Sequence, residues 1–214
     1  MTIGEKEEVM IVDKSVSEFV QDTASESPVP GGGSASALAG ALAAALSAMV
    51  AQLTITKKND EDSKSSLVHL KDAADALRTE LIQGVDRDTA AYQNFLCALR
   101  LPKTTPLEQE KRKSEIALAK KEICQVPFSI AENAFDVLKL AGRAVIEGRK
   151  DVVTDSAVAV LLAKAAARGA LYNVKFNLSA VTDEAYVTQL LDEVTKMERT
   201  VEEEEKTALA AVGL

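Results

Sequence analysis

Apolar residues recur every three or four positions along most of the chain, which is the spacing of helices that bury one face. The longest such run predicts a helix over residues 65–100. Its apolar positions are Leu67, Leu70, Ala74, Leu77, Leu81, Val85, Tyr92 and Leu96. Residues 34–54 lack this alternation, because alanine dominates them and no charged residue lies between Glu26 and Lys57. A segment that is apolar on all sides is typical of a buried helix.

Capping signals mark where two further helices begin. Residues 15–18 read Ser-Val-Ser-Glu, a capping box that opens a short helix expected to end near Thr23. Residues 105–108 read Thr-Pro-Leu-Glu, which places threonine at the cap and proline at the first helical position. The helix that starts there is expected to end at the glycines of positions 142 and 148.

The rest of the chain predicts two more helices and an irregular start. Thr154 or Asp155 is expected to cap a fifth helix, and a sixth begins near Asp183. Residues 1–14 are expected to form an irregular or extended arm, with an extended piece at Val9–Val12. The prediction is therefore an all-α fold, a single domain that spans all 214 residues as a bundle of about six helices, several of them long.

Small side chains shape the expected packing. Aromatic residues make up only 4% of the chain and tryptophan is absent, so alanine, leucine and valine build the core. The alanine-rich helix is expected at the centre of the bundle, where small side chains let neighbouring helices approach closely. Alternatively, it exposes its alanine face as a seam between two copies, since obligate interfaces resemble a core cut in half. We favour a homodimer.

Charge and reactive side chains narrow the classes of function. A formal net charge of −8 argues against a nucleic-acid partner. The first residues are partly acidic and lack a long apolar core, so no signal peptide is expected, and residues 34–54 are too mildly apolar to favour a membrane span. We expect a cytoplasmic protein in which Cys97 and Cys124 are reduced core thiols. With His69 as the single histidine, neither a zinc site nor a Ser-His-Asp triad is expected.

A glycine loop precedes the alanine-rich helix. It comprises Pro30, Gly31, Gly32, Gly33 and Ser34. Glycines permit close approach of a ligand or of another backbone, and the N–H groups at a helix start bind acceptors and anions. The loop is therefore either part of a ligand site or a tight turn into a closely packed helix. It lacks the spacing and the preceding strand of a dinucleotide-binding motif.

One carboxylate stands on an apolar stripe. In the predicted helix 65–100, Asp88 shares one face with Val85 and Tyr92, because these residues are three and four positions apart. Asp86 lies on another face. Burial raises the pKa of a carboxyl group toward the range that general acid–base catalysis needs. The structural alternative is a buried aspartate tied to an arginine or to the N-terminus of a neighbouring helix.

Two amides and a second aspartate are further candidates. Asn173 and Asn177 lie one turn apart on the fifth helix, where amides offer a ligand both donors and acceptors. The alternative is that they cap the helix or bridge to a neighbour. Asp155 is most simply a helix cap, with a ligand contact as a secondary role.

Four segments resemble the formimidoyltetrahydrofolate cyclodeaminase and methenyltetrahydrofolate cyclohydrolase family. They are SVSEFVQDTASESPVPGGGSASALAGALAAALSAMVAQLT, VDRDTAAYQNFLCALRLPKTTPLEQEKR, QVPFSIAENA and TDSAVAVLLAKAAARGALYNVKFNLSAVTDEAY. The resemblance runs from about Ser15 to Tyr186. The chain departs from it at Gly148-Arg149, where the family often has Gly-Asn, and at Thr154-Asp155, where it often has Ser-Asp.

The resemblance implies an all-helical homodimer that binds tetrahydrofolate in a crevice near the subunit interface. It gives Asp88 the acid–base role. It implies substrate-binding roles for Pro30, Gly31, Gly32, Gly33, Ser34, Tyr92, Asp155, Asn173 and Asn177. The substrate is then a tetrahydrofolate derivative, and neither a metal nor a permanently bound cofactor is expected.

Two reactions fit this resemblance. In cyclodeamination, N10 of the folate attacks the formimino carbon on N5 and ammonia leaves. In cyclohydrolysis, water attacks the same carbon in the methenyl ring, which opens to the 10-formyl form. The stretches LTITKK and NVKFNL look more like the stand-alone cyclohydrolases. The competing class is a non-catalytic helical dimer that binds folate or serves as a scaffold.

Overall fold

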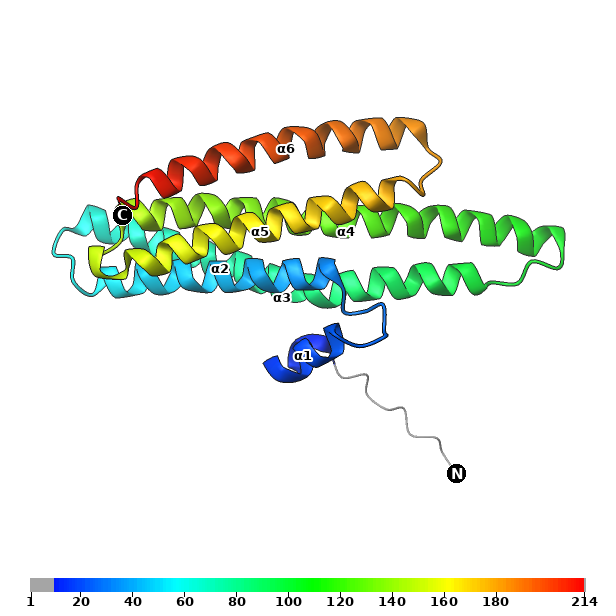
Figure 1. The fold of residues 1–214 in the computed structure, drawn as a ribbon, viewed down its shortest axis with the longest axis horizontal. Helices are drawn as coiled ribbons and strands as arrows, with labels where there is room; N and C mark the ends of the chain where they lie inside the picture. The colour runs from blue at the N-terminus through cyan, green and yellow to red at the C-terminus, as the bar shows by residue number, and fades with distance from the viewer. Residues whose placement is uncertain (1–9, 214) are drawn as a thin grey trace, which may run out of the picture.

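The computed structural model describes residues 10–213, which form α-helices joined by short loops (Figure 1). None of these described residues forms a strand. Six α-helices and two short 3₁₀ helices follow one another within this part of the chain. They are η1 (Ile11–Asp13), α1 (Val16–Thr23), α2 (Gly32–Ile55), α3 (Glu61–Arg100), α4 (Pro106–Glu147), η2 (Lys150–Val152), α5 (Val153–Leu178) and α6 (Glu184–Ala210).

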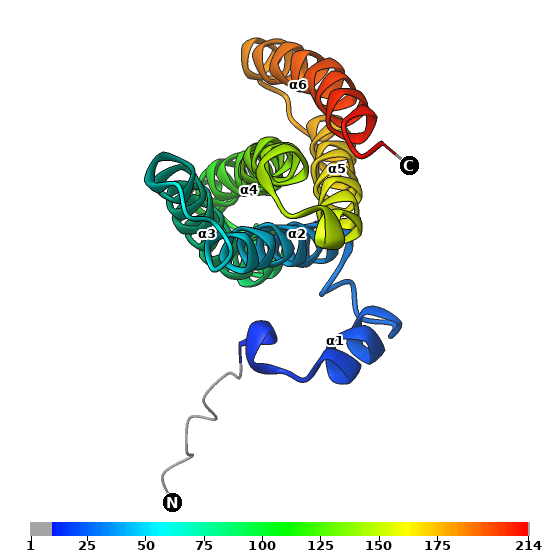
Figure 2. The same cartoon turned by 90° about the vertical axis from the view of Figure 1, so that its left-hand side faces the viewer.

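Helices α2, α3, α4 and α5 pack as a bundle, seen end-on in Figure 2. Helix α6 lies along α4 and α5, and η1 lies against α3. Helix α1 projects from the bundle near the start of α2 (Figure 1). Helices α3 and α4 are the longest, with 40 and 42 residues, and their joined ends extend beyond α2 and α5. The predicted all-α fold is confirmed.

Three of the helix starts predicted from the sequence are correct. Ser15 and Glu18 form a capping box at α1, and Thr105 and Glu108 form one at α4. The Asp183 side chain accepts a hydrogen bond from the N–H of Tyr186 at the start of α6. These signals act within one turn of helix, so a short stretch of sequence is enough to predict them.

Two other helix starts, and one short segment, were predicted wrongly. Helix α3 begins at Glu61 because Asp60 accepts from the N–H of Ser63 and acts as the cap. Helix α5 begins at Val153, since the 3₁₀ turn before it leads directly into the helix, and neither Thr154 nor Asp155 is its cap. The extended piece expected at Val9–Val12 is a 3₁₀ turn from Ile11 onward, and Val9 lies outside the described residues.

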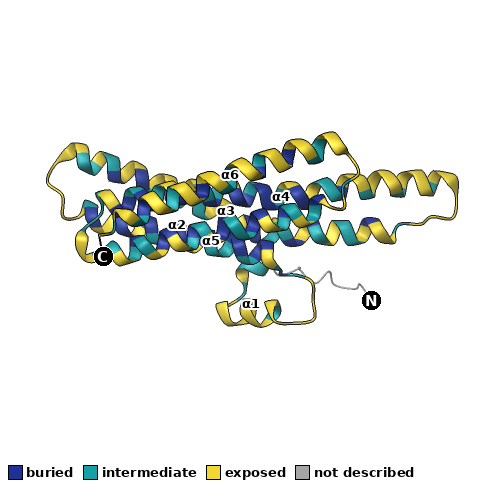
Figure 3. Ribbon diagram, turned by 45° about the horizontal axis from the view of Figure 1, so that its top comes forward, coloured by how far each residue is buried: buried dark blue, intermediate teal, exposed yellow. Residues whose placement is uncertain are grey.

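Small residues bring the central helices together, as expected for the alanine-rich segment. A Cβ added to Gly40 of α2 would lie 3.1 Å from Leu81 of α3 and 3.4 Å from Ala166 of α5. A Cβ added to Gly84 of α3 would lie 3.3 Å from Ile130 of α4. Buried positions recur along the helices of the bundle, where they alternate with intermediate and exposed ones in Figure 3. Larger side chains at these crossings would force the helices apart.

The two cysteines differ in environment. Cys124 is buried, and burial raises the pKa of its thiol to about 11. Cys97 is exposed on the extended part of α3, so the prediction that it is a core thiol was wrong. Its apolar neighbours in the sequence belong to a stretch of α3 that α2 and α5 do not reach.

We predict that Ala74→Leu destabilises the protein, because Ala74 is fully buried in α3 and extra methyl groups overpack a core. The free energy of unfolding should fall by about 1–3 kcal/mol, measured by urea unfolding. Ala73→Leu is the matched control, because Ala73 is the exposed neighbour in the same helix. Equal losses in both variants would contradict the packing described here.

Candidate active site

Asp88 lies where α3 passes the first turn of α2. Its carboxylate packs against Gly33, and a Cβ added to that glycine would lie 2.5 Å from the carboxyl carbon, well inside contact distance. Only glycine therefore lets the carboxylate come this close to the α2 backbone. The first N–H groups of a helix attract a negative charge. The glycine loop therefore makes a tight turn into a packed helix, and the first turn of that helix receives an anionic group of the protein itself.

Ser34 forms the hydrogen bond that holds this carboxylate. Its hydroxyl donates to Asp88 Oδ2 over 2.9 Å. Partial burial raises the pKa of Asp88, while the hydroxyl and the main-chain N–H of Ser34 oppose the rise. Asp86 faces the other way and accepts a hydrogen bond from the N–H of Ile11 at 2.7 Å. The two aspartates therefore have the different orientations predicted from the sequence.

Asp88 is half-buried, which corrects the prediction of a buried carboxylate. None of the charged side chains in residues 10–213 is fully buried. The reason is local: α2 begins and α5 ends beside Asp88, so α2 covers one side of the carboxyl group and the other side opens into a cavity of about 190 Å³. The cavity is lined by Pro28, Val29, Gly31, Gly32, Gly33, Asp88, Ala91, Tyr92, Ile123, Asn173, Phe176 and Asn177.

The two amides face the same cavity and are anchored within the protein. Asn173 Nδ2 donates to the carbonyl of Gly169 at 2.9 Å, in its own helix. Asn177 Nδ2 donates to the carbonyl of Ile123 at 2.6 Å, which ties α5 to α4. Asn177 is therefore a bridge to a neighbouring helix, as in the alternative, whereas Asn173 bonds within its own helix. One N–H of each amide is engaged in this way, so each side chain still offers a ligand its carbonyl oxygen as an acceptor and its second N–H as a donor.

The structure brings together seven of the predicted site residues. These are Gly31, Gly32, Gly33, Asp88, Tyr92, Asn173 and Asn177. Ser34 is fully buried behind Asp88 and does not line the cavity. Pro30 lines a separate hollow beside Thr89 and Gln93. Asp155 stands 18 residues before Asn173, about 27 Å along α5, so this chain does not bring it to the cavity.

Sequence reasoning missed the apolar part of the cavity wall. Val29 and Phe176 flank the opening, and Ala91 and Ile123 lie deeper. Ile123 carries no chemical signal of its own, because an isoleucine at a buried helical position looks like any other core residue. Phe176 lies at the end of an apolar stripe but is 79% exposed, a feature that only the structure reveals.

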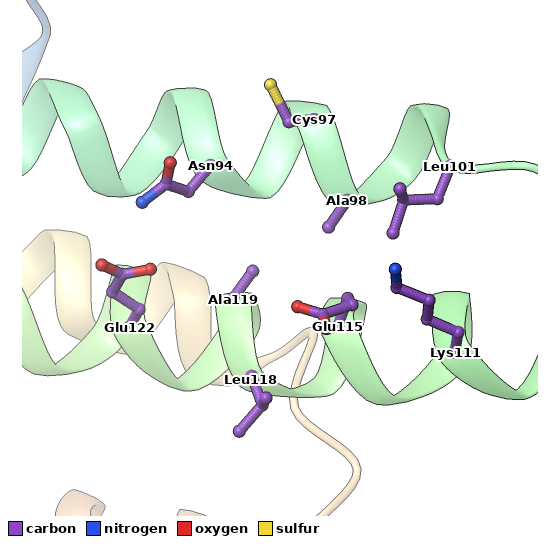
Figure 4. Close-up of a pocket in the computed structure, with 9 residues that line it drawn as sticks. All are labelled: Asn94, Cys97, Ala98, Leu101, Lys111, Glu115, Leu118, Ala119 and Glu122. Carbon is purple, nitrogen blue, oxygen red and sulfur yellow. The ribbon is translucent and has the colours of Figure 1, made fainter.

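A larger hollow lies between the extended ends of α3 and α4 (Figure 4). It measures about 410 Å³ and carries Lys111, Glu115 and Glu122 around an apolar floor. It contains none of the predicted site residues. No group of three potential metal ligands was found among the described residues. The smaller cavity at Asp88 is therefore the candidate active site.

Known proteins are similar to this chain in sequence and in fold. The family description "Formiminotransferase-cyclodeaminase" matches residues 15–196. The methenyltetrahydrofolate cyclohydrolase of Methylorubrum extorquens is 34% identical over 185 residues, which cover 86% of this chain and 89% of that protein. The formimidoyltransferase-cyclodeaminase of Gallus gallus is 31% identical over 195 residues, 90% of this chain but only 36% of that protein.

A solved structure agrees over nearly the full length. The crystal structure of formiminotetrahydrofolate cyclodeaminase from Thermotoga maritima superposes with a TM-score of 0.84 at 26% identity, covering 94% of this chain and 96% of that one. The chain belongs to the formiminotransferase-cyclodeaminase family. It is an enzyme of the kind that these relatives are named for.

We predict that Gly33→Ala displaces the Asp88 carboxylate, because the new Cβ overlaps it. The free energy of unfolding should fall by about 1–3 kcal/mol, and a crystal structure should show Asp88 turned away from α2. Gly32→Ala is the control, since a Cβ there meets only the end of the Asn173 side chain at 3.3 Å. If Asp88 keeps its place in Gly33→Ala, the close approach is not what positions it.

Proposed function

We propose that the protein is a methenyltetrahydrofolate cyclohydrolase in which Asp88 is the general acid–base group. The observation that carries this proposal is the position of Asp88, a carboxyl group on the wall of the cavity with a raised pKa. The relative from Methylorubrum extorquens supports the choice of reaction, because it bears that name and aligns over most of both chains.

The reaction needs one group that moves protons. Water adds to the carbon that bridges N5 and N10, and its proton passes to the Asp88 carboxylate. The hydroxyl of this adduct then loses its proton to solvent as the formyl C=O forms and the bond from the carbon to N5 breaks, and the carboxyl group returns its proton to N5. The product is the 10-formyl form, and one proton is released overall. A carboxyl group whose pKa lies nearer neutrality than usual suits both halves of this exchange.

Neighbouring side chains of the cavity orient the substrate. The carbonyl oxygens of Asn173 and Asn177 are acceptors for the N–H groups of the pterin. Tyr92 and Phe176 offer flat apolar faces for ring contact. The cavity holds about 190 Å³, less than drug-sized ligands occupy, so the pterin end of the folate enters and the rest lies outside.

The second candidate is formimidoyltetrahydrofolate cyclodeaminase. The Thermotoga maritima structure supports it, because that protein is named for this activity and has nearly the same extent. Here N10 attacks the formimino carbon, Asp88 accepts the N10 proton, and the leaving nitrogen takes a proton before it departs as ammonia. The same carboxyl group serves both reactions.

We predict that Asp88→Asn lowers kcat by at least about 100-fold, the contribution typical of general acid–base catalysis, with little change in thermal stability. Turnover of methenyltetrahydrofolate is followed by absorbance, and turnover of formimidoyltetrahydrofolate by ammonia release. Asp86→Asn is the matched control and should retain activity, since Asp86 bonds to Ile11 outside the cavity.

Each result has a clear meaning. Full activity of Asp88→Asn would refute the catalytic assignment. Wild-type protein that binds methenyltetrahydrofolate but converts neither substrate would support the non-catalytic folate-binding dimer. Faster turnover of the formimidoyl substrate would favour the second candidate.

We also propose that two copies associate through the outer face of α2 and α5, called here the α2–α5 face. Its apolar residues alternate at spacings of four and three along both helices. All twelve are partly or largely exposed: Ala35, Ala39, Leu42, Leu46, Met49 and Leu53 on α2, and Val158, Leu162, Ala165, Gly169, Tyr172 and Phe176 on α5. Helix α6 covers α4 and the other side of α5 instead.

The size and composition of this face fit a second copy. Helix α2 has 24 residues and is about 36 Å long. Helices α2 and α5 are each about 10 Å wide, so side by side they present roughly 700 Å². Stable interfaces bury about 800 Å² per partner. No charged residue occurs in α2, and both Gly32–Ile55 and Lys150–Leu178 are apolar and long enough to pass as membrane spans by composition alone. A protein partner shields such a surface from water.

We predict that Leu42→Glu converts a dimer into a monomer, because Leu42 is 52% exposed at the middle of the α2–α5 face and a buried carboxylate there lacks a partner. Analytical ultracentrifugation measures the change. Leu118→Glu is the control, since Leu118 is 62% exposed on α4 away from this face. A monomeric wild type, or an unchanged dimer in Leu42→Glu, would contradict the proposal.

A further inference from the structure

A hydroxyl group that no ligand reaches lies behind Asp88. Ser34 is fully buried, and its oxygen sits among three others. The distances are 2.9 Å to Asp88 Oδ2, 3.2 Å to the carbonyl oxygen of Val85 and 3.3 Å to the hydroxyl of Thr89. Thr89 is also buried, so this cluster lies on the protein side of Asp88.

Ser34 has one proton to donate and lone pairs to accept with. It therefore cannot donate to Asp88 and to Val85 at once. When Asp88 is ionised, the Ser34 proton points at Oδ2, and the Thr89 hydroxyl can donate to the Ser34 oxygen. When Asp88 is protonated, its own O–H can donate to the Ser34 oxygen, and the Ser34 proton turns to the Val85 carbonyl. Every polar group has a partner in both arrangements.

We propose that Ser34 is a positioning residue that hydrogen-bonds to Asp88 in both of its protonation states by rotating its hydroxyl between Asp88 and the Val85 carbonyl. The carboxyl group then gains and loses a proton without moving and without leaving a buried polar group unpaired. A group that shuttles protons twice in each turnover benefits from this, because unpaired buried polar atoms are costly. The inference rests on the proposed role of Asp88.

Apart from burial, the hydrogen bond from Ser34 is the main local influence on Asp88, because no second charged group shares the cavity with it. Helix α2 contributes no charged residue, and Asp88 is the one charged residue among those that line the cavity. Tyr92 is the other titratable group there.

The nearby charged residues on the surrounding helices are paired with one another. On α5 and α4, Lys175 pairs with Glu198 and Lys121 pairs with Asp183. On α3, Arg87 pairs with Glu80 and Asp86 binds the Ile11 N–H. Loss of the Ser34 hydroxyl is thus expected to act directly on Asp88.

The test combines a titration with kinetics on Ser34→Ala. Carbon-13 NMR of the aspartate carboxyl groups, with Asp88→Asn for assignment, gives the pKa of Asp88 without any assay of turnover. We expect this pKa to rise in Ser34→Ala, since the ionised form loses the stronger, charge-assisted bond. We expect kcat to fall by roughly tenfold with KM unchanged within about twofold, and the pH profile of kcat to shift upward with the pKa.

Matched variants show whether the effect comes from the hydrogen bond between Ser34 and Asp88. Thr89→Val removes the hydroxyl that touches Ser34 but not Asp88, so the pKa of Asp88 should move less than in Ser34→Ala. Ser34→Cys nearly keeps the size of the side chain and weakens its hydrogen-bond donor. If Ser34→Ala does not fold, Ser34→Cys is used in its place for all measurements. An unchanged pKa of Asp88 in the Ser34 variants overturns the inference. A raised KM with unchanged kcat also overturns the inference, because it would mean that Ser34 contributes to substrate binding.

Failure of the proposed function gives a different result. If Asp88→Asn remains fully active, Asp88 is not catalytic, yet the NMR titration still reports whether Ser34 bonds to Asp88.

Discussion

The contact between Asp88 and the first turn of α2 determines the rest of the site. A carboxylate on α3 lies against the backbone of α2 because Gly33 has no side chain, and the Ser34 hydroxyl bonds to it at 2.9 Å. Two opposing influences act on this group. Partial burial raises its pKa and the Ser34 donors lower it, with burial the larger effect. The result is a carboxyl group held in one place, on the wall of a cavity, and able to exchange a proton.

The same use of small residues organises the whole bundle. Gly40 and Gly84 let α2, α3, α4 and α5 cross at short distances, which leaves the first turn of α2, the middle of α3 and the last turns of α5 around one cavity. Alanine-rich helices also lack the charged surface that a solvated helix has. The outer face of α2 and α5 is therefore apolar, and the exposed Phe176 belongs both to this face and to the cavity wall.

Sequence reasoning succeeds where the cause is local and fails where it depends on neighbouring helices. The capping boxes at Ser15 and Thr105 and the orientation of Asp88 follow from spacing within one or two turns. Burial of Asp88 was overestimated, because a helical stripe gives direction but not where α2 begins and α5 ends. Cys97 was placed in the core for the same reason.

The site residues show the same limit. Ser34 is adjacent to Gly33 in sequence, yet it turns inward and serves Asp88 instead of the cavity. Asp155 shares a helix with Asn173 but stands at its other end. No spacing rule reveals that Ile123 contributes to the wall, because its place depends on how α4 packs against α5. The resemblance to a family identified the polar positions, and tertiary packing decided which of them meet.

A crystal structure with a non-hydrolysable methenyltetrahydrofolate analogue would show directly whether Asp88 meets the reacting atoms. We expect the pterin end in the cavity at Asp88, with the carboxylate within hydrogen-bond distance of N5 or of the atom that takes the place of the attacking water. Binding in the hollow between the ends of α3 and α4, with Asp88 remote from the ligand, would contradict this expectation.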